Sequence, residues 1–485
     1  MSSSNYTKPD IKTNFSSIPV YLFYLIAIAL YGFGIYSFYD YFVTPSSEQF
    51  LKLILLGAGL VALPFALIIF VIYLVISFFL SLIVLWIMSK IAKEILLFVS
   101  ITFPALFFGL FMFFFLATGF PGFVLMALIP GLLLLFVVYK FNALRRAGRF
   151  VEFSAKLILD EKALLGLPVI FGIFTLITGF FMVFGGWEIT KLFATASSGS
   201  SGQSLSAAGN VVTLIFEYFY LIIYFGGTYI LNSYVISYST DWYRGLDPSM
   251  KTARKDVNAV LPIILKYAFA TATINMIYKV LARLIATGRS SSTPASGTRR
   301  GGSSDGLNIT PWVLIGWIGY ILMSIFGMLW AFVNYFTLVA VVQNRQNLTT
   351  SIKDSARTMW DSFLDIVVSD VGFGLAMMIL FFVNLFTWFS AGFGIGYFLF
   401  TNQSDPLLFG FIIGIIFLIL SFYPYNIITM PMRSSYNTFL YCYAKDSLEG
   451  FSKPSRLEPE LRDNLALIQS KQARKRRMRD PSQYI

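Results

Sequence analysis

Long apolar runs separated by short polar connections extend through most of this 485-residue chain. A run of about 20 apolar residues is long enough to cross a hydrocarbon core about 30 Å thick as a helix. Ten runs meet this description, at 19–42, 53–88, 95–119, 122–139, 164–186, 211–237, 257–286, 311–342, 366–390 and 407–432. The pattern therefore predicts an all-α polytopic integral membrane protein with about ten transmembrane helices.

The run 53–88 is long enough for one tilted helix or two short ones. It contains Pro64 but no polar turn, and a turn inside lipid leaves backbone polar groups without hydrogen-bond partners. We therefore favour one helix.

Basic residues are distributed unevenly among the connections. The connections 89–94, 140–163, 238–256 and 343–365 hold 15 Lys and Arg, whereas those on the opposite side hold 5. Connections rich in Lys and Arg lie on the cytoplasmic side of a membrane protein. This bias predicts that both termini are cytoplasmic and that the protein lies in the plasma or cell membrane.

The connector at 351–367, SIKDSARTMWDSFLDIV, predicts an amphipathic helix in the membrane interface. Its apolar residues recur at helical spacing, and its charged residues occupy the other face. The stripe consists of Ile352, Ala356, Met359, Trp360, Phe363, Leu364 and Val367. Similar segments at 247–266 and 145–168 suggest three repeated units of one amphipathic helix and one hairpin. The alternative is that polytopic proteins commonly place basic amphipathic segments on this side.

These patterns divide the chain into four parts. We expect a cytoplasmic tail at 1–18, a four-helix membrane segment at 19–139, a six-helix membrane domain at 140–432 and a basic cytoplasmic tail at 433–485. The last tail is either solvated or attracted to anionic lipid; nucleic-acid binding is less favoured. The bilayer is the expected partner.

Composition excludes several kinds of chemistry. The chain is 57% hydrophobic and 12% charged, has no histidine and has a single cysteine, Cys442. Histidine is the commonest metal ligand and the usual general base near neutral pH. We therefore expect no enzyme activity, no metal site and no cofactor.

Ionisable residues inside membrane spans are functional candidates, because burying each one costs free energy. Their depths predict a cluster of Glu217 with Lys279 or Arg283 and a second pair, Lys266 with Asp370. The alternatives are static contacts between helices, or long side chains that extend to the interface.

Three further motifs have two readings each. EYFYLIIYF (217–225) places a carboxylate among aromatic residues, as a cage for a quaternary ammonium would. Phe and Tyr are abundant in all the spans, however, so lipid-facing packing is the favoured interpretation. GFGIG (392–396) is typical of close helix packing or a hinge. Asn308 and Asn402 begin glycosylation sequons on the predicted outer side.

Three segments resemble the choline transporter-like family: SSYNTFLYCYAKDSLEG (434–450), SIKDSARTMWDSFLDIVVSD (351–370) and RFVEFSAKLILDEKALLGLP (149–168). Gly245–Arg254 is similar to a connector of uncharacterised prokaryotic polytopic proteins. Together the resemblances cover about 140–450. They imply ten spans with both ends cytoplasmic, although Asn437 replaces the family's Asp and the family's large loop after the first span is missing.

Two functions are compatible with these features. The first is a transporter for a small or lipid-like solute, which spans, buried charges and the resemblance favour. The second is a non-catalytic scaffold or accessory subunit with protein partners in a membrane complex. An intramembrane enzyme is the least favoured.

Overall fold

The computed structural model describes residues 18–43, 49–196, 203–290, 311–402 and 405–449, and the regular secondary structure in these ranges is α-helical. The helices are α1 (Ile18–Val43), α2 (Gln49–Thr118), α3 (Gly122–Tyr139), α4 (Phe141–Asp160), α5 (Ala163–Ala196), α6 (Gln203–Tyr243), α7 (Met250–Ser290), α8 (Pro311–Val333), α9 (Thr337–Asn344), α10 (Leu348–Asp361), α11 (Phe363–Leu399), α12 (Pro406–Leu420) and α13 (Phe422–Glu449). Nine helical stretches among the described residues are long and apolar enough to cross a membrane. The polytopic all-α class is therefore confirmed.

The structure has nine such stretches rather than ten, because the connection predicted at 89–94 is helical. The two spans predicted around it form the single helix α2, which is kinked where Ile91 leaves helical geometry (φ −133°, ψ 15°). At the kink, the Glu152 carboxylate of α4 accepts a hydrogen bond from the Lys93 backbone N–H at 3.0 Å. A side chain that enters the helical ladder is a known cause of kinks. The connection therefore continues the helix and binds α4 through the backbone N–H of Lys93 instead of forming a loop.

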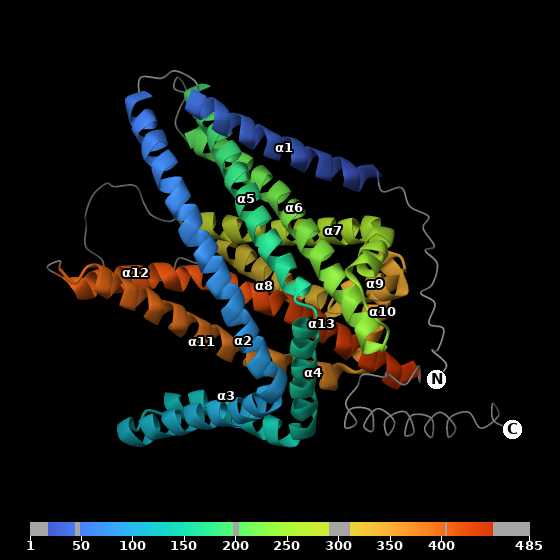
Figure 1. Ribbon diagram of the computed structural model, residues 1–485. Helices are drawn as coiled ribbons and strands as arrows, with labels where there is room; N and C mark the ends of the chain where they lie inside the picture. Colours follow the sequence, from blue (N-terminus) through green and yellow to red (C-terminus); the bar gives the residue numbers. More distant parts are fainter. Residues whose placement is uncertain (1–17, 44–48, 197–202, 291–310, 403–404, 450–485) are drawn as a thin grey trace.

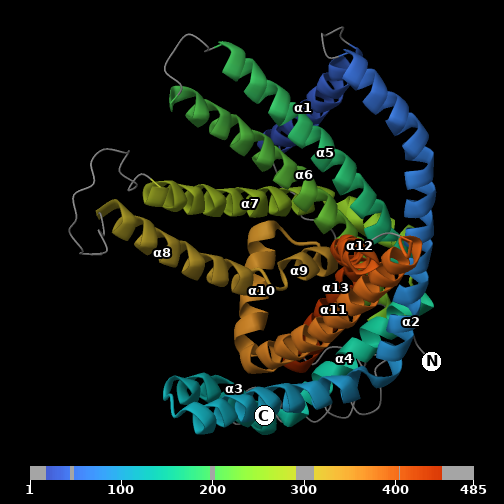
Figure 2. The same ribbon diagram turned by 90° about the vertical axis from the view of Figure 1, so that its left-hand side faces the viewer.

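Three helical hairpins, α5–α6, α7–α8 and α11–α12, extend in different directions from a common base (Figures 1 and 2). We call this base the hub. It consists of α4, α9 and α10 with residues 85–96, 235–243, 253–267, 366–380 and 427–447. The four connections rich in Lys and Arg all meet here. The connector predicted at 247–266 has no helix of its own, because α7 continues from it without a break.

The centre of the hub is aromatic. On α4, buried residues recur every three or four positions, as at Leu144, Ala147, Val151, Ser154 and Ile158, and the helix packs against α2 and α13. Phe153 lies edge-on to Trp242 of α6, with 5.4 Å between ring centroids. Edge-to-face pairs are favourable beyond their buried area. The hub is therefore the most extensive packed core among the described residues.

Helix α10 confirms the amphipathic helix predicted within 351–367. It ends earlier than predicted, at Asp361, because Ser362 separates it from α11. One polar edge of the helix, which carries Ser351, Ser355 and Thr358, faces the protein, whereas the Arg357 side chain is 85% exposed. The side chains of Ser355 and Thr358 are buried, and the Ser355 hydroxyl accepts a hydrogen bond from the Phe336 backbone N–H at 2.9 Å. Trp360 on the apolar stripe is 77% exposed. Met359 of the same stripe is buried, so the described side chains of the stripe divide between the protein and the surface.

The helix formed by α12 and α13 bends near Pro424. Proline has no N–H, so the carbonyl of Leu420, four residues earlier, lacks its usual donor. The Tyr73 hydroxyl of α2 donates to that carbonyl at 2.5 Å. The Asn384 side chain of α11 donates to the next carbonyl, that of Ser421, at 2.6 Å. Side chains of α2 and α11 thereby provide hydrogen-bond donors for the two backbone carbonyls.

Helices α11 and α12 approach each other through glycines. A Cβ atom on Gly396 would lie 2.7 Å from the Phe409 carbonyl oxygen and 2.9 Å from the Gly410 Cα, both backbone atoms. The neighbouring Gly394 faces open space. Small residues let membrane helices pack closely, so in GFGIG the close-packing reading fits the contacts of Gly396.

Candidate functional site

The structure brings Glu217 and Lys279 together. Glu217 lies on α6 and Lys279 on α7, and the Lys279 Nζ is 2.5 Å from the Glu217 Oε1. Their side chains are 23% and 41% exposed, respectively. The match in depth along two adjacent antiparallel helices, each rising 1.5 Å per residue, accounts for the contact. The side chain of Arg283, the other predicted partner, lies outside the described residues.

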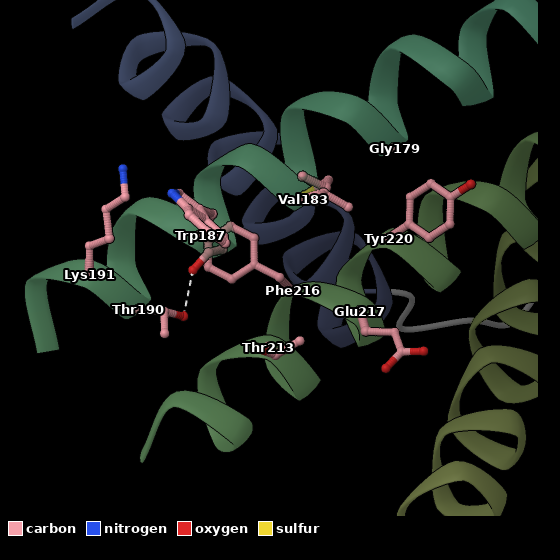
Figure 3. Close-up of a pocket in the computed structure, with 11 residues that line it drawn as sticks. Gly179, Val183, Trp187, Thr190, Lys191, Thr213, Phe216, Glu217 and Tyr220 are labelled. Carbon is pink, nitrogen blue, oxygen red and sulfur yellow. Dashed lines mark hydrogen bonds between the residues drawn. The ribbon is translucent and has the colours of Figure 1, made fainter. Parts of the chain in front are cut away.

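Glu217 also borders a cavity between α5 and α6, lined by residues from 179–191 and 213–220. We call it the α5–α6 cavity; its volume is about 700 Å³. Trp187, Phe216 and Tyr220 provide aromatic surface (Figure 3). Gly179 and Gly186 also line the cavity, and neither has a side chain that would fill it. The cavity is therefore mostly aromatic and apolar, with one carboxylate at its edge.

Two charged side chains of the cavity have partners within the chain. The Glu217 carboxylate points away from Trp187, on the side of α6 that faces α7 (Figure 3). The Lys191 ammonium lies 5.4 Å from the centroid of the Trp187 ring and 2.8 Å from the Glu188 carboxylate. Ammonium groups within about 6 Å of a ring centroid are attracted to its face. The two groups of the cavity that could bind a cation, the Glu217 carboxylate and the Trp187 ring, therefore each contact a lysine of the protein.

The second group of polar residues lies in the hub. Asp256 of α7 forms an ion pair with Arg345, 2.6 Å apart, and accepts a hydrogen bond from the Ser237 hydroxyl of α6 at 2.7 Å. The side chains of Asp256 and Arg345 are 4% and 18% exposed. Arg345 follows α9 in the left-handed conformation (φ 49°), which directs the chain from α9 into α10. This pair therefore connects α6, α7 and the α9–α10 junction.

A second ion pair joins α10 to α13. The Asp354 carboxylate lies 2.9 Å from the Lys445 ammonium and accepts hydrogen bonds from the Tyr441 hydroxyl and the Asn344 amide. Next to it, the Gln343 amide donates to the sulfur of the fully buried Cys442 at 2.8 Å. The polar groups of the hub thus bind one another and hold its helices together.

Glu152 in α4 is a further buried acidic group of the hub, 1% exposed. Burial raises its pKa above the ordinary value, and the Arg149 guanidinium, 2.8 Å away, offsets part of this effect. The buried charge of this carboxylate therefore costs free energy, and the hydrogen bonds from the Arg149 guanidinium and the Lys93 backbone N–H reduce that cost.

The ion pairs described among the placed side chains do not include the predicted pair of Lys266 with Asp370. Among the described side chains, Asp370 binds the Tyr335 hydroxyl, 2.7 Å away, and that hydroxyl also lies 3.2 Å from the Asn437 Oδ1. Tyr335 precedes α9, in a break of the predicted helix 311–342 that the apolar pattern does not reveal. Of the two sequons, Asn402 is exposed in the turn after α11, and Asn308 lies outside the described residues.

The sequence pattern did not indicate that Asp256, Arg345 and Asp354 form ion pairs in the hub. For Asp256 a signal existed, because it lies between the buried residues Ala253 and Val260 on the apolar side of its connector. An acidic residue on an apolar stripe indicates a buried partner. Trp187 carried no comparable signal, since it lies on α5 and only the fold brings it near Glu217.

These features define a polytopic helical membrane protein with a polar hub and an aromatic cavity between two of its long apolar helices. The family model described as plasma-membrane choline transporter matches residues 123–448, which is more than half of the chain. The protein belongs to this family, and the resemblance stated above is confirmed. No curated protein matches the chain.

Proposed function

We propose that this protein carries a small organic cation of the choline type across the membrane and binds it in the α5–α6 cavity. The observation that carries the proposal is the position of Glu217 at the edge of an aromatic cavity. Aromatic faces attract quaternary ammonium groups, and a carboxylate adds a full opposite charge in a medium of low dielectric constant. The family description supports the same class of solute.

The hub faces the cytoplasm in this proposal, and both termini lie there in a plasma membrane. The excess of Lys and Arg in the connections that meet at the hub supports this orientation. Glu217 lies 26 residues before the hub end of α6 at Tyr243, or roughly 39 Å along the helix at 1.5 Å per residue. The cavity then belongs to the outer half of the membrane region.

Transport requires a solute to pass the hub, which the pairs Asp256–Arg345 and Asp354–Lys445 hold closed in this structure. Release to the cytoplasm therefore requires these helices to separate. Transporters achieve this by moving one helix bundle against another around a site near the midplane.

Uptake into proteoliposomes tests the proposal. The purified chain is reconstituted, and uptake of labelled choline is measured beside a panel of amino acids, sugars and lysolipids. We expect saturable choline uptake, inhibited by other quaternary ammonium compounds but not by the neutral isostere 3,3-dimethylbutanol. Glu217→Gln should reduce uptake at least tenfold, as loss of a charge-assisted contact of about 1.4 kcal/mol or more does.

Two results would contradict it. Uptake of none of the solutes, together with co-purification of a fixed protein partner, would favour the scaffold. Uptake that is the same in wild type and Glu217→Gln would place the solute elsewhere.

A further inference from the structure

Both cation-binding groups of the α5–α6 cavity contact an ammonium group of the protein itself. Lys279 holds the Glu217 carboxylate at 2.5 Å, and Lys191 lies 5.4 Å from the Trp187 ring centroid. Lys191 lies on α5, which borders the cavity, and Lys279 lies on α7, which packs against α6. The two contacts are of the kinds that a quaternary ammonium solute would make, an ion pair and a cation–π contact.

We propose that Lys191 and Lys279 are tethered competitors, whose ammonium groups occupy the cation-binding groups of the cavity when no solute is present. Solute binding then exchanges one cation for another. The inference rests on the proposed function and adds how the same site controls affinity and selectivity.

The geometry favours an exchange rather than a permanent pair. Lys279 and Lys191 are 41% and 45% exposed, and their long side chains can withdraw without movement of the backbone. This exposure lets a solute or water reach both charges, so the pair is weaker than a fully buried one. Glu217, by contrast, is 23% exposed and has a short side chain. Its carboxylate points away from Trp187 (Figure 3), and Lys279 binds it there. In the proposed exchange the carboxylate leaves Lys279 and rotates toward the aromatic rings.

The exchange has a physical advantage in a membrane. An unpaired carboxylate at this depth is costly, and Lys279 supplies the opposite charge before the solute arrives and after it leaves. A solute without positive charge cannot replace Lys279 and meets a Trp187 ring that Lys191 already covers. The lysines therefore select for charge at the expense of affinity.

Removal of a competitor should tighten solute binding. In Lys279→Met, which keeps the apolar stem and removes the charge, we expect the KM for choline uptake to fall about threefold to fivefold, the factor that corresponds to an exposed ion pair. In Lys191→Met we expect a fall of about twofold to threefold, since an exposed cation–π contact is weaker. Lower KM values are informative because damage to the fold would not raise affinity.

Lys156→Met is the matched control. The Lys156 ammonium lies 5.8 Å from the Phe153 ring centroid in α4, a similar contact in the hub and away from the cavity. Its KM should equal that of wild type.

The outcomes separate the two proposals. If wild type takes up choline and neither Lys279→Met nor Lys191→Met lowers the KM, the inference is overturned and the proposed function stands. If wild type takes up no organic cation, both are overturned. A lower KM that Lys156→Met reproduces would also overturn the inference, because the effect would then not depend on the cavity.

Discussion

The ion pair between Asp256 and Arg345 makes the hub testable by a single substitution. Arg345→Ala removes the guanidinium and leaves the Asp256 carboxylate, 4% exposed, with the Ser237 hydroxyl 2.7 Å away. Arg345 has a positive φ of 49°. Alanine meets the same backbone cost there, whereas glycine would relieve it, so Arg345→Ala reports mainly on the lost ion pair.

The expected effect follows from the burial of the two groups. Removing one partner of a buried pair costs about 3–5 kcal/mol. Arg345 is 18% exposed and the Ser237 hydroxyl remains, so we expect about 2–3 kcal/mol. Asp256→Asn should cost less, about 1–2 kcal/mol, because it removes the more deeply buried charge and leaves an Arg345 side chain that can reach solvent. The double variant should cost less than the sum of the two.

Cys442 provides the assay. It is the single cysteine of the chain, is fully buried in the hub and binds Gln343. A fluorogenic maleimide can therefore label it only when the hub opens, and its labelling rate reports the opening equilibrium. A destabilisation of 2–3 kcal/mol should raise that rate about 30-fold to 150-fold in Arg345→Ala. Cys442→Ala gives the background.

Two results would refute the reasoning. A labelling rate of Arg345→Ala within twofold of wild type would mean that the ion pair does not hold the hub closed. Strictly additive effects of Arg345→Ala and Asp256→Asn would mean that the two side chains do not interact.

Three other substitutions test separate parts of the fold through the melting temperature in detergent, followed by light scattering. Gly396→Ala should cost about 1–3 kcal/mol by overpacking α11 against α12, whereas Gly394→Ala, in open space, should cost nothing; equal effects would contradict the close approach. Tyr73→Phe should cost about 1–3 kcal/mol, because the Leu420 carbonyl loses its donor, and an unchanged melting temperature would mean that another group replaces it. Burial raises the pKa of Glu152, so the stability that its protonated form contributes is present below the ordinary pKa of 4.5 and is lost as pH rises through the folded pKa. Over that pH range the melting temperature of Glu152→Gln should therefore rise relative to that of wild type. A difference in melting temperature that does not change with pH would contradict this.

The sequence predicted the parts of the fold that depend on local patterns. Apolar length located the membrane helices, and the helical spacing in 351–367 located α10, which the structure places at 348–361. Matching depth was enough to bring Glu217 and Lys279 together, because antiparallel neighbours joined by one loop have few alternative registers. The kink at Ile91 was not predictable in this way, since it depends on Glu152 of a helix about 60 residues away.

Contacts between distant segments could not be predicted. Asp256 and Arg345 are separated by 89 residues, and Arg345 lies in a connection that the pattern marks only as basic. Asp370 was paired with Lys266 on charge and depth, and neither indicates the hydrogen bond that Asp370 accepts from the Tyr335 hydroxyl. The aromatic lining of the cavity was partly visible in 217–225, where Tyr220 lies, while Trp187 joins it through packing of α5 on α6.

Binding of labelled choline to the purified chain in nanodiscs tests the central claim most directly, because it does not require a full transport cycle. Wild type should bind one choline per chain, an excess of unlabelled choline should displace it, and Glu217→Gln should bind at least tenfold more weakly. Equal binding by wild type and Glu217→Gln, or no binding that unlabelled choline displaces, would contradict the account.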